Sequence, residues 1–184
     1  MRGKRFFVIM SSDDRKTETN GGNGMKTAVV YYSMGGNTQS VAEEIAKSTG
    51  ADLIRIEPVK AFPDKGFKKF LWGGKSAVMK ERPELVPYDF DAEKYDEVVI
   101  GTPVWASSFT PPIRSFVAEN AEALRSKKLA VFVCFSGGGA DKAIEKLKRF
   151  IGVESFAAEL ILIDPKDRPS EGNAEKTAAF CAKL

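Results

Sequence analysis

Short apolar runs alternate with helical patterns along most of this chain, and that alternation constrains its fold more than any other feature. The apolar runs predict strands at residues 27–33, 52–57, 97–102, 129–135 and 156–163. Several are nearly continuous in Val, Ile and Phe, which is typical of strands buried on both faces. The helical patterns cover residues 39–49, part of 67–80, 112–124, 140–150 and 174–183. Five strands alternating with five helices predict a three-layer α/β domain with a parallel sheet and right-handed crossovers.

Residues 1–24 stand apart from this pattern. They end in the polar, glycine-rich stretch Asn20-Gly-Gly-Asn-Gly24, so we expect a disordered tail or linker there. Residues 25–184 then form one expected domain, since a chain of 184 residues with 43% hydrophobic content can bury a sizeable core. No apolar run approaches the ~20 residues of a membrane span. We therefore expect a cytoplasmic protein without membrane insertion.

Composition also narrows the chemistry. The chain has no histidine, which removes the commonest general base and the commonest transition-metal ligand. Its two cysteines, Cys134 and Cys181, are far apart in sequence, so they predict neither a disulfide framework nor a metal site. The 28 basic residues are nearly matched by 25 acidic ones, for a net charge of +3, which does not indicate nucleic-acid binding. We expect no catalytic side chain and no metal.

The first predicted strand leads into a turn suited to an anion. Gly35 and Gly36 allow backbone N–H groups to converge, and the side chains of Ser33, Asn37 and Thr38 add donors. The helix predicted from residue 39 would place this turn at a positive helix N-terminus. The alternative is an ordinary glycine-rich turn capped by Thr38. The turn matches neither a P-loop nor a dinucleotide-binding signature.

Two further loops should share the same edge of the sheet, because parallel strands end on one side and ligands bind there. The third strand leads into residues 101–112, a long loop of small residues with one large aromatic, Trp105. The fourth leads into residues 136–139, Ser-Gly-Gly-Gly, before another helix. Phosphate donors, an aromatic side chain and open backbone would then surround one crevice.

Three separated motifs resemble those of the flavodoxin-like superfamily, in particular its short-chain flavodoxin-type FMN proteins. They are Tyr32-Ser-Met-Gly-Gly-Asn-Thr38, Gly101-Thr-Pro-Val-Trp105 and Phe135-Ser-Gly-Gly-Gly139. The resemblance extends over residues 25–184 and implies a sheet of order 2-1-3-4-5 that binds FMN non-covalently. Carried over by position, it implies that the FMN phosphate is held by Ser33, Met34, Gly35, Gly36, Asn37 and Thr38. It implies that the isoalloxazine is lined on one side by Thr102, Pro103, Val104 and Trp105, and on the other by Ser136, Gly137, Gly138 and Gly139.

The chain also departs from that family. Gly35 stands where a hydroxyl residue is common, which removes a donor worth about 1 kcal/mol. The glycine loop lacks the tyrosine that often stacks on the flavin, so Trp105 is the best candidate for that role. The alternative is a core tryptophan that covers the edge of the sheet. Trp72 lies in a helical pattern and is interpreted as a core or partner-surface residue.

The resemblance implies electron transfer between redox partners by cycling of FMN. The main alternative is an NAD(P)H-dependent FMN or quinone reductase, in which residues 61–87 would shape a substrate pocket. A domain without flavin that binds another phosphate compound is a third possibility. Flavodoxins commonly have a strongly acidic surface, whereas this chain is near neutral, which argues against docking to basic partner proteins. The partners are thus expected to be redox proteins or a small-molecule acceptor.

Overall fold

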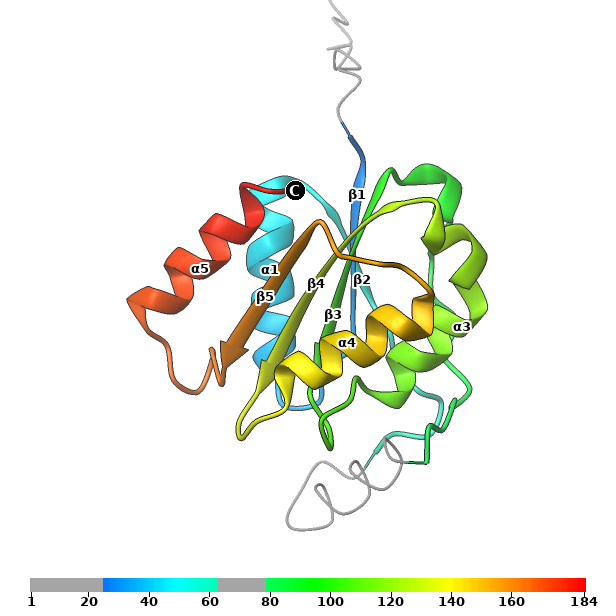
Figure 1. The fold of residues 1–184 in the computed structure, drawn as a ribbon, viewed down its shortest axis with the longest axis horizontal. Helices are drawn as coiled ribbons and strands as arrows, with labels where there is room; N and C mark the ends of the chain where they lie inside the picture. The colour runs from blue at the N-terminus through cyan, green and yellow to red at the C-terminus, as the bar shows by residue number, and fades with distance from the viewer. Residues whose placement is uncertain (1–24, 63–78) are drawn as a thin grey trace, which may run out of the picture.

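A single parallel sheet forms the centre of the protein (Figure 1). The structure is a computed structural model that describes residues 25–62 and 79–184. The sheet order is β2-β1-β3-β4-β5, and every neighbouring pair is parallel. In chain order the strands are β1 (Thr27–Tyr31), β2 (Asp52–Arg55), β3 (Glu97–Pro103), β4 (Lys128–Phe135) and β5 (Ala158–Ile163). The predicted strands and their order are confirmed.

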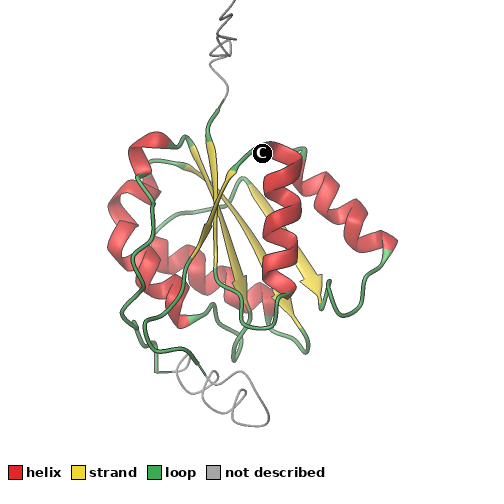
Figure 2. Ribbon diagram, turned by 180° about the vertical axis from the view of Figure 1, so that it is seen from behind, coloured by secondary structure: helices red, strands yellow, loops and turns green. Residues whose placement is uncertain are grey.

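Helices cover both faces of the sheet, as Figures 1 and 2 show from opposite sides. One face carries α1 and α5, and the other carries α3 and α4. Their bounds are α1 (Asn37–Thr49), α3 (Pro111–Arg125), α4 (Ala140–Ile151) and α5 (Glu171–Cys181), with a short 3-10 turn η1 (Ala92–Lys94) before β3. The three-layer α/β arrangement is therefore confirmed.

The two faces of the sheet bury separate apolar clusters, because successive strand residues point to opposite sides. In β1, Val30 belongs to the same buried cluster as Ile113 of α3 and Leu147 of α4. Its neighbour Val29 belongs instead to the cluster that contains Ile45 of α1 and Phe180 of α5. All six of these side chains are almost completely buried. The near-continuous apolar strands thus reflect burial on both faces.

The ends of the helices show local physical causes. Helix α1 begins at Asn37, two residues before the predicted start, with Gly36 as its N-cap and no side-chain cap. The alternative in which Thr38 caps the helix is therefore wrong. Gly50 ends α1 with φ 73°, as predicted, and donates its N–H to the Ala46 carbonyl. Helix α5 begins at residue 171, earlier than predicted, because the Ser170 side chain accepts a hydrogen bond from the backbone N–H of Asn173.

Several predictions lie outside the described residues. They are the tail at residues 1–24, the role of Trp72, and the helix expected within residues 67–80, of which only residues 79 and 80 are described. Within the described ranges, no helix has the length and apolar character needed to cross a membrane.

Candidate functional site

A cavity of about 430 Å³ opens at the carboxyl ends of the strands. Four segments line it: residues 33–38 except Gly36, residues 103–107, residues 134–138, and Asp164. They follow β1, β3, β4 and β5 in turn, and these strand ends meet along one edge of the sheet (Figure 1). The volume lies within the range of ligand and cofactor sites. The edge predicted to carry a crevice therefore does carry one.

The turn after β1 presents backbone donors to this cavity. Gly36 takes φ 91°, a conformation that favours glycine, and donates its N–H to the Ser33 Oγ at 3.1 Å. The next three N–H groups, from Asn37 to Gln39, have no acceptor inside the helix that they begin. No side chain caps them. This helix N-terminus is suited to an anion such as a phosphate group.

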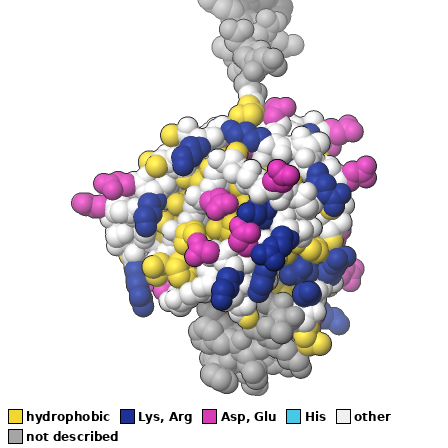
Figure 3. Space-filling view, in the orientation of Figure 1, with side chains coloured by type: hydrophobic (Ala, Val, Ile, Leu, Met, Phe, Trp, Pro, Cys, Tyr) yellow, Lys and Arg dark blue, Asp and Glu magenta, His cyan; other side chains and the backbone are white. Residues whose placement is uncertain are grey.

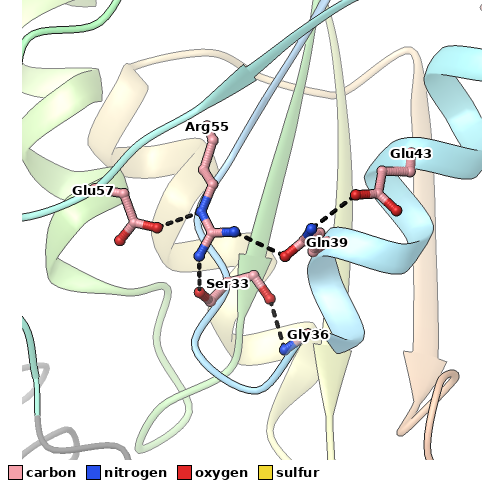
Figure 4. A network of polar contacts seen from close by, with 6 residues as sticks. All are labelled: Ser33, Gly36, Gln39, Glu43, Arg55 and Glu57. Carbon is pink, nitrogen blue, oxygen red and sulfur yellow. Dashed lines mark hydrogen bonds and ion pairs between the residues drawn. The ribbon is translucent and has the colours of Figure 1, made fainter.

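Arg55 braces the turn from the neighbouring strand β2, as Figure 4 shows. Its Nη2 donates to the Ser33 carbonyl at 3.4 Å, and its Nη1 donates to the Gln39 Oε1 at 2.8 Å. Glu57 pairs with the same guanidinium. The network links the turn to the first turn of α1 and places the paired Arg55 guanidinium beside it. The sequence motif did not indicate Arg55, because its position depends on the pairing of β1 with β2.

Asn37 connects the turn to the loop after β5. Its Oδ1 accepts from the backbone N–H of Lys166 at 2.8 Å, and its Nδ2 donates to the Asp167 Oδ2 at 2.8 Å. The side chain predicted to bind phosphate is thus occupied, and its backbone N–H remains for a ligand. The Lys166 Nζ lies 2.8 Å from the position that a Cβ on Gly36 would take. A second cation therefore lies against the turn.

Trp105 begins a tight turn that forms one wall of the cavity. Trp105 and Ser108 exchange two backbone hydrogen bonds of 2.9 Å. Between them, Ala106 and Ser107 take φ values of 49° and 54°, which non-glycine residues rarely adopt. The Trp105 ring meets that of Tyr32 edge to face at 5.9 Å. Such strained backbone is often found at ligand sites.

Trp105 contacts both the core and the cavity. It packs against the core cluster that contains Tyr32 and meets the ring of Phe62 edge to face at 5.2 Å. It is also partly exposed and lines the cavity. The ring is thus held in a defined orientation at the cavity wall, where it can contact a ligand.

Asp164 places a carboxylate in the cavity. Its negative charge is opposite to the positive N-terminus of α1 at the turn after β1. Its Oδ1 accepts from the Ser136 Oγ at 2.5 Å, and Arg168 lies 3.8 Å from its Oδ2. Asp164 takes a φ of 41°, so it is another non-glycine residue in the left-handed region. The Ser136 hydroxyl, predicted to face a flavin, is therefore also tied to β5. An aspartate directly after the last strand was a signal that the sequence reading missed.

Three predicted site residues do not line the cavity: Gly36, Thr102 and Gly139. Thr102 is fully buried, and its Oγ1 accepts from the backbone N–H of Thr110 at 3.1 Å. This bond holds the loop between them. Gly36 and Gly139 act through their backbone, because both take positive φ at the start of a helix. The residues that the prediction missed in the cavity lining are Ala106, Ser107, Cys134, Phe135 and Asp164.

Cys134 is expected to be unreactive in the folded protein. Burial raises the pKa of its thiol to about 12 from 9.0, and the thiolate is the reactive form. The thiol should resist a maleimide at pH 8 in the native state and react fully in guanidinium, with a Cys134→Ala variant to assign the signal. Equal labelling rates in both states would contradict this. Because the folded pKa is the higher one, this group's stabilising contribution is present below pH 9 and is lost as the pH rises toward 12.

The chain is similar to known proteins in both sequence and structure. A family model described as Flavodoxin matches residues 26–163 of this chain. Among solved structures, a flavoprotein in complex with FMN from Lactobacillus acidophilus NCFM has a TM-score of 0.63 and 20% identity, over 78% of this chain and 96% of that one.

Two further structures share the fold. A protein of Bacteroides eggerthii DSM 20697 has a TM-score of 0.66 and 22% identity, over 86% of this chain and 99% of that one. The two-electron reduced flavodoxin of Megasphaera elsdenii has a TM-score of 0.50 and 19% identity, over 86% of this chain and 99% of that one. At these identities the structural matches show the fold alone. The assignment to a family depends on the sequence match.

Proposed function

The chain belongs to the flavodoxin family, and from this premise we propose that its cavity binds FMN non-covalently and that the protein carries electrons between redox partners. The resemblance of the three sequence motifs to this family is thereby confirmed. The fold match to an FMN complex of Lactobacillus acidophilus is consistent with the same cofactor.

The turn after β1 fits the phosphate of FMN. It offers unpaired N–H groups at the start of α1, together with the hydroxyls of Ser33 and Thr38. Lys166 brings a positive charge against Gly36, whereas the Arg55 guanidinium that holds the Ser33 carbonyl is paired with Glu57. The Lys166 charge offsets the hydroxyl donor that is missing at Gly35. The donors and the charge together match a dianionic phosphate.

The rest of the cavity fits a planar aromatic ring. Trp105 offers an aromatic wall, and residues 136–138 offer open backbone on the other side. FMN, when bound, supplies the one-electron and two-electron chemistry. The chain positions it, excludes water with the Trp105 ring and surrounds it with apolar and backbone groups. These roles of the predicted site residues stay predictions.

One observation carries the proposal. The anion-binding turn, the Trp105 turn and the glycine loop, which are far apart in sequence, line the same cavity. Reconstitution tests it directly: added FMN should lose its fluorescence and remain with the protein through gel filtration. A chain that leaves FMN fluorescence unquenched would exclude both the carrier and any flavin enzyme.

A second function has an observation in its favour. A second cavity, lined by basic side chains, shares the lining residue Ala106 with the proposed FMN cavity. The positive charge of this second cavity suits an anionic small-molecule electron donor. The protein would then be an NAD(P)H-dependent reductase. Anaerobic mixing of the FMN-loaded chain with NADPH or NADH separates the two functions. Rapid bleaching of the flavin absorbance supports the reductase, and slow or no bleaching supports the carrier.

A Gly139→Ala substitution should weaken FMN binding about tenfold, or about 1.4 kcal/mol. The new Cβ would lie 2.3 Å from the Ser107 Oγ and 2.9 Å from its Cα, at φ 86°. It would therefore displace the turn that carries Trp105. The matched control is Gly172→Ala in α5, where nothing lies within 4 Å of the added Cβ and which does not line the cavity. Fluorescence titration with FMN measures both variants, and equal affinities would show that this packing does not affect the site.

A further inference from the structure

A second cavity, of about 510 Å³, lies beside the first. Its charged lining is entirely basic: Lys80, Arg82, Arg114, Lys146 and Arg149. Among the described residues that line it, none is acidic. Figure 3 shows Lys and Arg side chains gathered on the lower right of this face of the molecule. Five like charges around one cavity repel one another, so the arrangement favours an anion.

Arg114, from α3, is the buried member of this group. It is only 6% exposed, and its Nε has no hydrogen-bond partner among the described residues. Its guanidinium lies over the rings of Phe109 and Phe150, at 4.2 and 4.7 Å from their centroids. Burial, and to a lesser extent the charge of Arg82, lowers the pKa of Arg114. A buried cation without an acidic partner is costly, and a bound anion would remove that cost.

Four further basic side chains line the cavity beside Arg114. Arg82 lies over the same Phe150 ring, at 5.4 Å from the centroid. None of the five basic side chains forms an ion pair with an acidic residue in the described part of the chain. Lys146 donates to the Ser107 carbonyl at 2.8 Å, which connects the basic cavity to the Trp105 turn.

We propose that this basic cavity binds the phosphate group of a small organic molecule that exchanges electrons with the flavin in the neighbouring site. Arginine matches phosphate geometry with paired hydrogen bonds, and the volume is that of a small-molecule site. Ala106 lines both cavities, so a molecule held by its phosphate here would extend toward the Trp105 turn. The electron-exchange part of this inference rests on the second function given above, the NAD(P)H-dependent reductase, whereas the phosphate site rests on neither function.

Calorimetric titration of the FMN-loaded full chain with inorganic pyrophosphate tests the phosphate site. We expect saturable binding with one site per chain. Arg149→Gln, at an exposed position, and Arg114→Met, which replaces the buried charge, should each weaken it at least tenfold. Lys142→Gln is the matched control, because Lys142 is exposed on the same helix and does not line the cavity. It should leave the affinity within twofold.

Two results would overturn the phosphate site. One is an absence of saturable pyrophosphate binding, which would fit a face that docks an acidic protein. The other is equal binding by the wild type, Arg114→Met and Arg149→Gln. Because Arg149 is exposed, that variant keeps the test valid if Arg114→Met folds poorly. A chain that failed to bind FMN could still be titrated with pyrophosphate, so the two proposals fail separately.

Flavin reduction then identifies the source of the phosphate. Under anaerobic conditions, we expect NADPH to bleach the flavin, pyrophosphate to compete with it, and Arg149→Gln to raise the NADPH concentration for half-maximal rate at least tenfold. Faster reduction by NADPH than by NADH would assign the site to the 2′-phosphate, and equal rates would assign it to the shared diphosphate. Reduction that is insensitive to pyrophosphate and to Arg149→Gln would overturn the electron-exchange part.

Discussion

A Gly101→Ala variant is expected to lose about 3 kcal/mol of unfolding free energy, at the upper end of the usual cost of overpacking. Gly101 lies in β3, directly opposite Phe132 of β4. A Cβ at this position would lie 2.2 Å from the Phe132 Cζ and 2.5 Å from its Cε1. Phe132 is fully buried within a packed cluster, so its ring cannot move aside. Urea denaturation followed by circular dichroism measures the loss.

A double-mutant cycle makes this test specific. Phe132→Ala alone should cost about 3–5 kcal/mol through the cavity it leaves. In that background Gly101→Ala should cost little, because the ring that it would strike is gone. Gly172→Ala is the control, since nothing lies within 4 Å of the added Cβ. If the losses of unfolding free energy at residues 101 and 132 were additive, contact with the Phe132 ring would not be the reason that residue 101 must be glycine.

Replacing Trp105 with Ala is expected to weaken FMN binding by about 2 kcal/mol, or about 30-fold, which is typical of a lost aromatic stacking contact. The cavity also gains access for water where the indole stood. The visible absorbance bands of bound FMN should shift, because they respond to the polarity around the flavin. Fluorescence titration and absorbance spectra of the reconstituted variant measure both effects.

Trp105→Phe is the matched control, because it keeps an aromatic ring at the cavity wall. It should retain most of the affinity. Trp105 also packs against the rings of Tyr32 and Phe62, so the stability of each variant without FMN should be measured in parallel. Unchanged affinity and spectra in Trp105→Ala, with reduced stability, would show that the residue only covers the edge of the sheet.

The general position of the site could be predicted from the sequence. The segments at residues 33–38, 103–105 and 136–138 each follow an apolar strand, and parallel strands end at one edge of a sheet. Their glycines and hydroxyls already indicated an anion site. The structure brings these three segments to one cavity. Local patterns were sufficient here because strands and turns depend mainly on nearby residues.

The partners of individual side chains could not be predicted in this way. Asn37 bonds to residues 166 and 167 across about 130 positions of sequence. Thr102 is used within its own loop, where it bonds to Thr110. Arg55 reaches the turn only because β2 pairs with β1. Each of these contacts depends on the packing of separate elements, which no local pattern encodes.

By itself, the sequence determined the parallel sheet, the order of elements along the chain, and the loops that carry the site, since apolar periodicity and glycine turns are local properties. Tertiary structure alone decided which atoms of those loops face the cavity. It also decided that Arg82, Arg114 and Arg149, from three separate segments, surround a second cavity. Such a site arises where helices α3 and α4 pack side by side, so its charge becomes visible only once the chain is folded.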